Sequence, residues 1–233
     1  MTAPIPPPAR LGLRLVFGGL LMVAAAWLFG AIAEDVVTGD RITLFDAALA
    51  QWLHAHANPA LTRWMFTVSN LHSTVAVSGY AAAAGLWFWR ARQWRRLTTL
   101  AVCMAGGLAL NVAMKLAFHR ARPVFEDPLL TLSSYSFPSG HVMGSTVLYG
   151  LIVAWVFVGT PRAVWRGLAL GAGLLAVGAV AFSRMYLGVH YLSDVSAAFL
   201  EGVAWLALSL GGLAELWRRT AQFPQPAPPA LGP

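Results

Sequence analysis

The residues of this chain that could do chemistry lie in three short clusters, each beside a long apolar run. Lys115 and Arg122 follow one run, the tetrapeptide Pro-Ser-Gly-His at 138–141 precedes the next, and the segment 183–194 links two more. Cations and the free amides at a helix start can bind an oxyanion, and a histidine near a carboxylate can attack its central atom. The clusters therefore predict a phosphoryl-transfer site, provided that the fold brings them together.

The segment 183–194 supplies the nucleophile in this interpretation. His190 and Asp194 are four residues apart, so on a helix they share a face and the carboxylate can accept the proton of one imidazole nitrogen. The other nitrogen is then free to attack phosphorus, which predicts a phosphohistidine intermediate. Arg184 precedes His190 by six residues, and a turn near Gly188 is expected to bring its guanidinium inward. A lone histidine here would more often be structural, but the neighbouring Arg184 and Asp194 favour catalysis.

The tetrapeptide 138–141 is expected to begin a helix and to bind a phosphate there. Proline is tolerated in a first helical turn, and free amides near Ser139 and Gly140, with the serine hydroxyl, can donate to phosphate oxygens. His141 can give or take a proton near neutral pH, so we expect it to protonate the leaving oxygen and then to activate water. Taken alone, the tetrapeptide would be an ordinary helix cap.

Lys115, Arg122 and Arg184 are expected to hold the non-bridging phosphate oxygens. Lys115 and Arg122 are seven residues apart, so on a continuing helix they share a face, and Pro123 then ends that helix. The alternative is that both cations reach lipid headgroups, as basic side chains at span ends often do.

No cofactor and no metal are expected at this site. Three cations can do by side-chain charge what a magnesium ion does in many phosphatases. The adjacent acids Glu126 and Asp127 lie between the first two clusters and could instead indicate a metal ligand. No further carboxylate or histidine has the spacing that such a site needs, so we favour the metal-free interpretation.

The elements that must position these residues are membrane-spanning helices. Of the 233 residues, 58% are hydrophobic and 11% are charged, against about 45–50% apolar and 25% charged residues in soluble domains. Most of the charge-free runs reach the ~17–25 residues that cross a bilayer. These runs are 15–33, 64–89, 97–114, 142–161, 167–183 and 202–214, the last reaching spanning length only if 195–200 joins it across Glu201. The sequence therefore predicts an all-α bundle of six transmembrane helices.

One domain is expected, over 10–221, with the chemistry concentrated in 97–215. The proline-rich tails 1–9 and 222–233 have too little apolar surface to fold, so we expect them to be disordered. Glu201 lies inside the sixth span, where we favour a structural hydrogen bond over a proton-linked role.

The segment 40–56, between the first two spans, has an amphipathic pattern. Thr43 and Asp46 have the spacing of a capping box, which predicts a short helix. Its expected apolar face comprises Phe45, Leu49, Trp52 and Leu53. The helix would lie either on the outer membrane surface or over the bundle as a lid.

The basic residues alternate by loop. They are Arg10, Arg14, Arg90, Arg92, Arg95, Arg96, Arg162, Arg166, Arg218 and Arg219. By the positive-inside rule both termini are cytoplasmic, and all three clusters face the exterior of a cell inner (plasma) membrane. This distribution accounts for the net charge of +7 without a nucleic-acid partner. A signal peptide cleaved near 31–33 is the alternative for the first span, but its apolar run exceeds the usual ~7–15-residue signal core.

The three clusters together resemble the signature of the type 2 phosphatidic acid phosphatase (PAP2) family. That signature is K-x6-RP, then PSGH, then SR-x5-H-x3-D, and 115–123, 138–141 and 183–194 match it at every specified position. The resemblance covers about 97–215 directly and the region before 97 only by topology. It implies a six-helix fold and metal-free catalysis, with catalytic His190, His141 and Asp194. It also implies a phosphate site formed by Lys115, Arg122, Ser139, Gly140 and Arg184.

The expected activity is that of an integral membrane phosphatase acting on lipid phosphates or diphosphates. Members of the resembled family act on phosphatidic acid, phosphatidylglycerol phosphate or polyprenyl diphosphates, and similar motifs occur in soluble acid phosphatases and vanadium haloperoxidases. We lean towards a polyprenyl diphosphate as the substrate, with membrane lipids as the other partners. The alternatives are a phosphotransferase with a lipid or sugar acceptor and a non-catalytic transporter of anionic lipids. His190 with Asp194 favours catalysis, because binding alone needs only cations.

Overall fold

The computed structural model describes residues 8–222, and within them the fold is all-α. The helices are α1 (Pro8–Thr38), α2 (Arg41–Ala55), α3 (Pro59–Leu71), α4 (Thr74–Arg90), α5 (Trp94–Phe118), α6 (Gly140–Gly159), α7 (Ala163–Tyr186) and α8 (Leu192–Gln222). Of the two tails predicted from the sequence, 1–7 and 223–233 lie outside the described residues. The helices include Pro8, Ala9 and Gln222.

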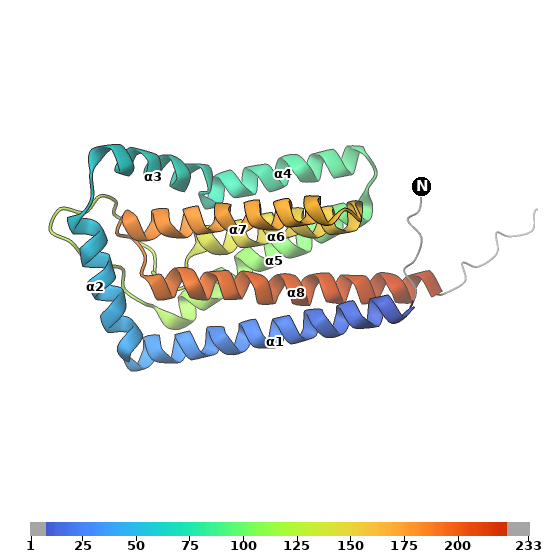
Figure 1. Cartoon of the computed structure of the whole chain (residues 1–233), viewed down its shortest axis with the longest axis horizontal. Coiled ribbons are helices and arrows are strands. Elements are labelled where there is room, and N and C mark those ends of the chain that lie inside the picture. The colour runs from blue at the N-terminus through green and yellow to red at the C-terminus, as the bar shows by residue number, and fades with distance from the viewer. Residues whose placement is uncertain (1–7, 223–233) are drawn as a thin grey trace, which may run out of the picture.

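Five of the helices are long and apolar enough to cross a membrane. They are 15–38 of α1, then α5, α6 and α7, and 192–220 of α8. Figure 1 shows them side by side with roughly parallel axes, as expected of a bundle that spans a bilayer. Five of the six predicted spans are thus helices of spanning length.

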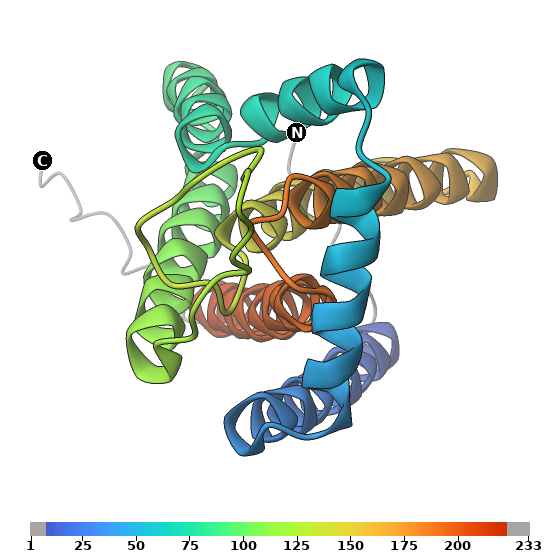
Figure 2. The same ribbon diagram turned by 90° about the vertical axis from the view of Figure 1, so that its left-hand side faces the viewer.

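The remaining predicted span, 64–89, is broken into two helices. α3 ends at Leu71, and the Ser73 hydroxyl then caps α4 by accepting the Ala76 amide at 3.2 Å. α4 has 17 residues, about 26 Å of helix, and it runs beside the bundle, whereas α3 turns away from its line (Figures 1 and 2). The charge-free run gave no sign of this break, because serine, asparagine and histidine interrupt a helix without adding formal charge.

The three clusters meet at one end of the bundle. α5 and α7 end there, and α6 and α8 begin there; this end is at the left of Figure 1 and faces the viewer in Figure 2. The loops after α4 and α6, which carry arginines, lie at the opposite end with the start of α1 and the end of α8. The prediction that the clusters share one side is confirmed.

Close contact between α6 and α8 sets the spacing of this end. A Cβ added to Gly202 of α8 would lie 2.7 Å from Cγ2 and 2.8 Å from Cβ of Thr146 on α6. Those separations are far below the ~3.5–4.0 Å of ordinary carbon contacts, so the two helices can approach this closely only with glycine at 202. α6 carries His141 and α8 carries Asp194, and the glycine therefore helps to hold these two residues near each other.

α2 lies across the end of the bundle where the three clusters meet, which we call the site end, and it packs there on α7 and α8 (Figure 2). Of the two predicted arrangements, the structure has the one over the bundle. Asp40 is the N-cap residue, so the predicted capping box at Thr43 and Asp46 was wrong. The buried face is formed by Asp46, Ala50 and Leu53, while Phe45 and Trp52 of the predicted apolar face are exposed.

Candidate active site

His190 and Asp194 are in contact, although not on one helix as predicted. His190 lies in the linker between α7 and α8, where Gly188 adopts φ 71° and turns the chain. Asp194 lies in the first turn of α8, with its Oδ2 atom 3.3 Å from His190 Nδ1. The same oxygen accepts the Tyr191 amide at 2.9 Å, so Asp194 also caps the start of α8.

The other nitrogen of His190 faces a guanidinium. Arg122 Nη1 lies 3.1 Å from His190 Nε2. Because a guanidinium only donates hydrogen bonds, Nε2 must be the acceptor nitrogen of a neutral ring, and the ring proton belongs on Nδ1 towards Asp194. His190 is buried, and burial lowers its pKa to about 3, against the opposing charge of Asp194. The geometry therefore presents a neutral imidazole with its lone pair directed at a cation.

Arg122 joins two loops around this imidazole. Its Nη1 donates to the Val189 carbonyl at 2.6 Å, and its Nε donates to the Ser134 carbonyl at 2.7 Å. Its Nη2 donates to the Tyr135 carbonyl at 3.1 Å. Burial lowers the pKa of Arg122 below its ordinary value, while the charge of Asp194 acts in the opposite direction.

Lys115 reaches the same loop from α5. Its Nζ donates to the Tyr135 carbonyl at 2.7 Å, so Lys115 and Arg122 share one acceptor. The prediction of a continuous helix through both residues was wrong, because α5 ends at Phe118 and His119 has φ 48°. The cations converge because the chain reverses after α5, and both are turned to the site rather than to lipid headgroups.

The start of α6 lies as predicted, with one correction. Ser139 is the N-cap residue and α6 begins at Gly140, so Pro138 lies just before the helix. The Ser139 amide donates to the Asp194 carbonyl at 3.2 Å and is not free for an anion, contrary to the prediction. The Ser139 hydroxyl, in contrast, is buried and has no hydrogen-bond partner within residues 8–222. Ser139 thus still offers a donor, and helix geometry leaves the Gly140 amide without an intrahelical acceptor.

His141 and Arg184 complete the group. His141 is half-buried near the start of α6, close enough to Lys115, Arg122 and Arg184 for their charges to act on it. Arg184 is 2% exposed at the end of α7, and its Nη1 donates to the Ser69 hydroxyl of α3. Its buried Nε has no partner in the described part of the chain. The predicted site residues are therefore brought together at one place, with two buried donor groups still unsatisfied.

Sequence reasoning missed a second group of residues around Asp194. Arg120 donates to Asp194 Oδ1 at 2.5 Å and to Asp46 Oδ2 at 2.9 Å. Burial alone would lower the pKa of Arg120, but the carboxylates of Asp194 and Asp46 outweigh it and raise the pKa above its ordinary value. Ser136 donates to Asp194 Oδ2, and Ser193 contacts both Arg120 and Asp46. A second arginine two residues before Arg122 was the one sequence signal that could have indicated this group.

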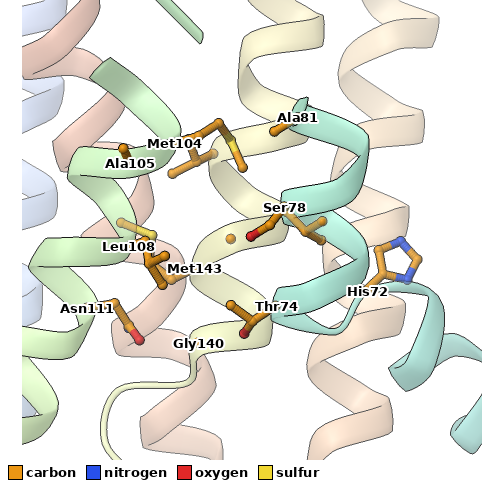
Figure 3. Close-up of a pocket in the computed structure, with 13 residues that line it drawn as sticks. His72, Thr74, Ser78, Ala81, Met104, Ala105, Leu108, Asn111, Gly140 and Met143 are labelled. Atoms are coloured by element: carbon orange, nitrogen blue, oxygen red, sulfur yellow. The ribbon is translucent and has the colours of Figure 1, made fainter. Parts of the chain in front are cut away.

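The predicted structural role of Glu201 is supported by a hydrogen bond inside the bundle. Asn111 Nδ2 of α5 donates to Glu201 Oε2 of α8 at 2.9 Å, and both side chains are buried. Asn111 also lines a cavity of about 230 Å³ between α4, α5 and α6. In Figure 3, Asn111, Thr74 and Gly140 mark one end of this cavity, and Met104 and Ala81 mark the other. The cavity therefore runs from the start of α6 into the apolar interior.

Of the two acids considered as metal ligands, Asp127 makes a different contact. Asp127 Oδ1 lies 2.9 Å from His54 Nε2 of α2, and its side chain is 91% exposed. This pair joins the loop before α6 to α2 at the outer rim. Within residues 8–222, no three histidine, cysteine, aspartate or glutamate side chains are grouped as metal ligands would be.

Comparison with known proteins decides the family. The model of the PAP2 superfamily matches residues 96–218. The chain belongs to the PAP2 superfamily. The match spans all three clusters and nearly all of the helices α5 to α8 that carry them, so the suspected resemblance is confirmed.

Individual PAP2 relatives agree with this assignment. The chain is 37% identical over 193 residues to phosphatidylglycerophosphatase B of Bacillus subtilis, covering 79% of this chain and 91% of that protein. It is 29% identical over 114 residues to an undecaprenyl-diphosphatase of Sulfolobus acidocaldarius, covering 47% and 50% respectively.

A solved structure shows the same fold. The crystal structure of a transmembrane PAP2-type phosphatidylglycerolphosphate phosphatase from Bacillus subtilis superposes with a TM-score of 0.74 at 25% identity. The match covers 87% of this chain and 98% of that one. This chain is thus a multi-pass integral membrane protein of the transmembrane PAP2 type.

Proposed function

We propose that this chain is an integral membrane phosphatase that hydrolyses lipid phosphates or diphosphates, with His190 as the nucleophile. The observation that carries the proposal is the imidazole of His190, held between Asp194 at Nδ1 and Arg122 at Nε2. An oriented neutral histidine beside an arginine is suited to attack on phosphorus, whereas a site that only binds an anion has no need of it. The activities named for the two relatives support the same reaction class.

In the first step, a terminal phosphate replaces His190 Nε2 as the partner of Arg122. The Nε2 lone pair forms a bond to phosphorus while the bond from phosphorus to the bridging oxygen breaks, and that oxygen leaves with the lipid alcohol of a monophosphate or with the lipid monophosphate of a diphosphate. His141 gives a proton to that oxygen, and Asp194 stabilises the positive charge that develops on the His190 ring. Lys115, Arg122 and Arg184, with the Ser139 hydroxyl and Gly140 amide, hold the non-bridging oxygens.

In the second step, water completes the reaction. His141, now neutral, accepts a proton from a water molecule whose oxygen attacks phosphorus. The bond between phosphorus and Nε2 breaks, and the Nε2 lone pair and inorganic phosphate are restored. The side-chain cations neutralise the phosphate throughout, so we propose that the reaction requires no metal and no other cofactor.

The lipid part of the substrate is assigned to the cavity between α4, α5 and α6. Its lining is mostly apolar and includes Val77, Met104 and Leu108, with Asn111 and Gly140 at the phosphate end. An isoprenoid or acyl chain fits such a lining, and its phosphate would then lie at the start of α6. The relatives named above support phosphatidylglycerophosphate and undecaprenyl diphosphate as the two leading substrates.

The charge distribution supports one orientation of the protein in the membrane. We propose that one domain, 10–221, spans the inner (plasma) membrane with both termini cytoplasmic and α4 as the sixth crossing. The site end of the bundle then faces the exterior, because the loops rich in arginine lie at the opposite end.

The test uses the purified protein in detergent with EDTA present and a panel of lipid phosphates. Wild type is expected to release phosphate, His190→Ala to be inactive, and His141→Ala to be slowed by on the order of 10²–10⁴-fold, the range for a lost acid–base group. Thermal unfolding of each variant shows that it is folded. Full activity of His190→Ala, or complete loss with EDTA, would refute the proposed mechanism.

A second measurement separates hydrolysis from the alternatives. Wild type incubated with labelled lipid phosphate and quenched with base should carry an acid-labile label that is absent from His190→Ala. Transfer of that label to an added alcohol or lipid in preference to water would indicate a phosphotransferase. Binding of the lipid with no label and no phosphate release would indicate a transporter.

A further inference from the structure

We propose that Asp46 of α2 is a positioning residue for phosphoryl transfer, acting through Arg120 on the catalytic carboxylate of Asp194. The inference rests on the proposed function of His190 and adds to it a residue from outside the region that carries the family motifs. Asp46 lies 148 positions before Asp194 in the sequence, and α2 is the element that brings it to the site.

The contacts of Asp46 form one closed group with those of Asp194. Arg120 Nη2 donates to Asp46 Oδ2 at 2.9 Å, and Arg120 Nη1 donates to Asp194 Oδ1 at 2.5 Å. The Ser193 amide donates to Asp46 Oδ1 at 3.0 Å, and the Ser193 hydroxyl donates to Asp46 Oδ2. Asp46 is 1% exposed and Asp194 is fully buried, so water cannot replace any of these partners.

Arg120 is therefore not one of the phosphate-binding cations. Both of its terminal nitrogens are used, one by Asp46 and the other by Asp194 and Ser193. Its guanidinium carbon also lies 4.4 Å from the centre of the Tyr191 ring, which restricts its position further. A guanidinium held in this way fixes the orientation of the Asp194 carboxylate rather than contacting substrate.

The charges explain why Asp46 is needed. Arg120 carries one positive charge between two carboxylates, so the three side chains together keep one net negative charge beside His190. That charge stabilises the imidazolium that develops when His190 Nε2 bonds to phosphorus. Without Asp46, Arg120 would cancel the charge of Asp194, and the carboxylate would accept the Nδ1 proton of His190 less well.

The contacts of Asp46 also explain the position of α2. The buried face of this helix contains a carboxylate at 46, followed by Ala50 and Leu53 one and two turns later. A buried carboxylate costs several kcal/mol unless it is paired, so its presence on an otherwise apolar face indicates a specific partner. The partners are Arg120, in the loop after α5, and Ser193, in the first turn of α8, so α2 is held next to the carboxylate of Asp194.

The experiment compares Asp46→Asn with wild type on a lipid phosphate substrate. We expect kcat to fall by on the order of 10–100-fold, because misplacing a reacting group by ~1 Å can cost ~10²-fold in rate. KM and inhibition by inorganic phosphate should stay within about twofold of wild type, because Lys115, Arg122 and Arg184 are untouched. The double variant Asp46→Asn/Arg120→Gln should be no slower than Arg120→Gln alone, since Asp46 acts through Arg120.

Asp40→Asn is the matched control, because it makes the same change at the exposed N-cap of the same helix, where the Asp40 side chain makes no capping hydrogen bond. It should behave as wild type. Arg120→Lys is the second variant in case Asp46→Asn does not fold. An ammonium lacks the planar fork that holds the two carboxylates in fixed directions, so kcat should fall with KM unchanged.

The inference is overturned if either Asp46→Asn or Arg120→Lys keeps full kcat, if the double variant shows additive losses, or if KM rises in step with the fall in kcat. A readout without substrate separates this result from failure of the proposed function. In ¹⁵N spectra of histidine-labelled protein, His190 should be protonated at Nδ1 in wild type and shift towards a mixture of tautomers in Asp46→Asn. An unchanged His190 signal would refute the positioning role even if wild type hydrolysed no lipid.

Discussion

Replacing Gly202 with alanine tests whether the spacing of α6 and α8 controls catalysis. The added Cβ would lie 2.8 Å from Cβ of Thr146, and ordinary carbon contact begins near 3.5 Å. A Cβ atom cannot rotate away, so the helices must separate locally by about 0.7 Å or more. Gly202 lies eight residues from Asp194, or about 12 Å along α8, so part of this shift should reach the site.

The expected size of the effect follows from that displacement. Misplacing reacting groups by ~1 Å can cost ~10²-fold in rate, so kcat for Gly202→Ala should fall by roughly ten- to a hundredfold. Overpacking of this kind costs about 1–3 kcal/mol of stability, which thermal unfolding in detergent would detect. The assay is phosphate release from a lipid phosphate at saturating substrate, with protein folded as judged by its unfolding transition.

Two further variants make the Gly202 result decisive. Gly178→Ala, on α7, adds a Cβ that meets no atom within 4 Å, and it should leave the activity unchanged. Thr146→Gly in the Gly202→Ala background removes the atoms that the new Cβ meets and should restore most of the rate. The reasoning is refuted if Gly202→Ala is as active as Gly178→Ala, or if the double variant is no better than Gly202→Ala.

Two more expectations concern the lipid cavity and the titration of His190. Ala105→Phe should partly fill the cavity of about 230 Å³ and raise KM for long-chain substrates at least tenfold. KM for a short, water-soluble phosphate ester should stay unchanged. Equal effects on both substrates would exclude the cavity as the binding site of the lipid chain. The pKa of folded His190 is lowered to about 3 from an ordinary 6.5, so the folded protein binds a proton at this residue less readily than the unfolded chain does. Keeping His190 neutral therefore costs no stability above pH 6.5, but the free energy of unfolding falls by up to about 1.4 kcal/mol per pH unit as the pH drops from 6.5 towards 3. His190→Asn should therefore flatten the fall in unfolding temperature between pH 7 and pH 5, and an identical slope in wild type and variant would contradict the burial of a neutral ring.

Much of the site was predictable because its chemistry is local in sequence. Arg184, His190 and Asp194 belong to one short segment, and Ser139 to His141 belong to another, so their types and spacing indicated an anion site without coordinates. Hydropathy identified five spanning helices, and the alternation of arginines between loops predicted that the three clusters share one end. These signals can be read from the sequence because the bilayer thickness and the asymmetry of basic residues constrain each segment separately.

Predictions that assumed regular helix geometry beyond a span were less successful. Arg122 was placed on a continuation of α5, but the chain reverses at His119, and Arg122 is held by carbonyls of the loop before α6. The Ser139 amide was expected to be free, but Asp194 of another helix accepts it. In both cases a residue distant in the sequence forms a hydrogen bond with the group, and sequence spacing does not reveal such a partner.

The amino-acid sequence alone determined which groups could bind and attack a phosphate, identified five helices of spanning length, and indicated that the three clusters share one end of the bundle, because each of these depends on residue type and local periodicity. Only the tertiary structure decided what surrounds Asp194. Asp46 and Arg120 gave no pattern that links them, since 74 residues separate them in the chain, and their pairing exists only where α2 crosses the end of the bundle. The orientation of the Asp194 carboxylate is set by contacts among α2, the loop after α5 and α8, and no single segment contains them.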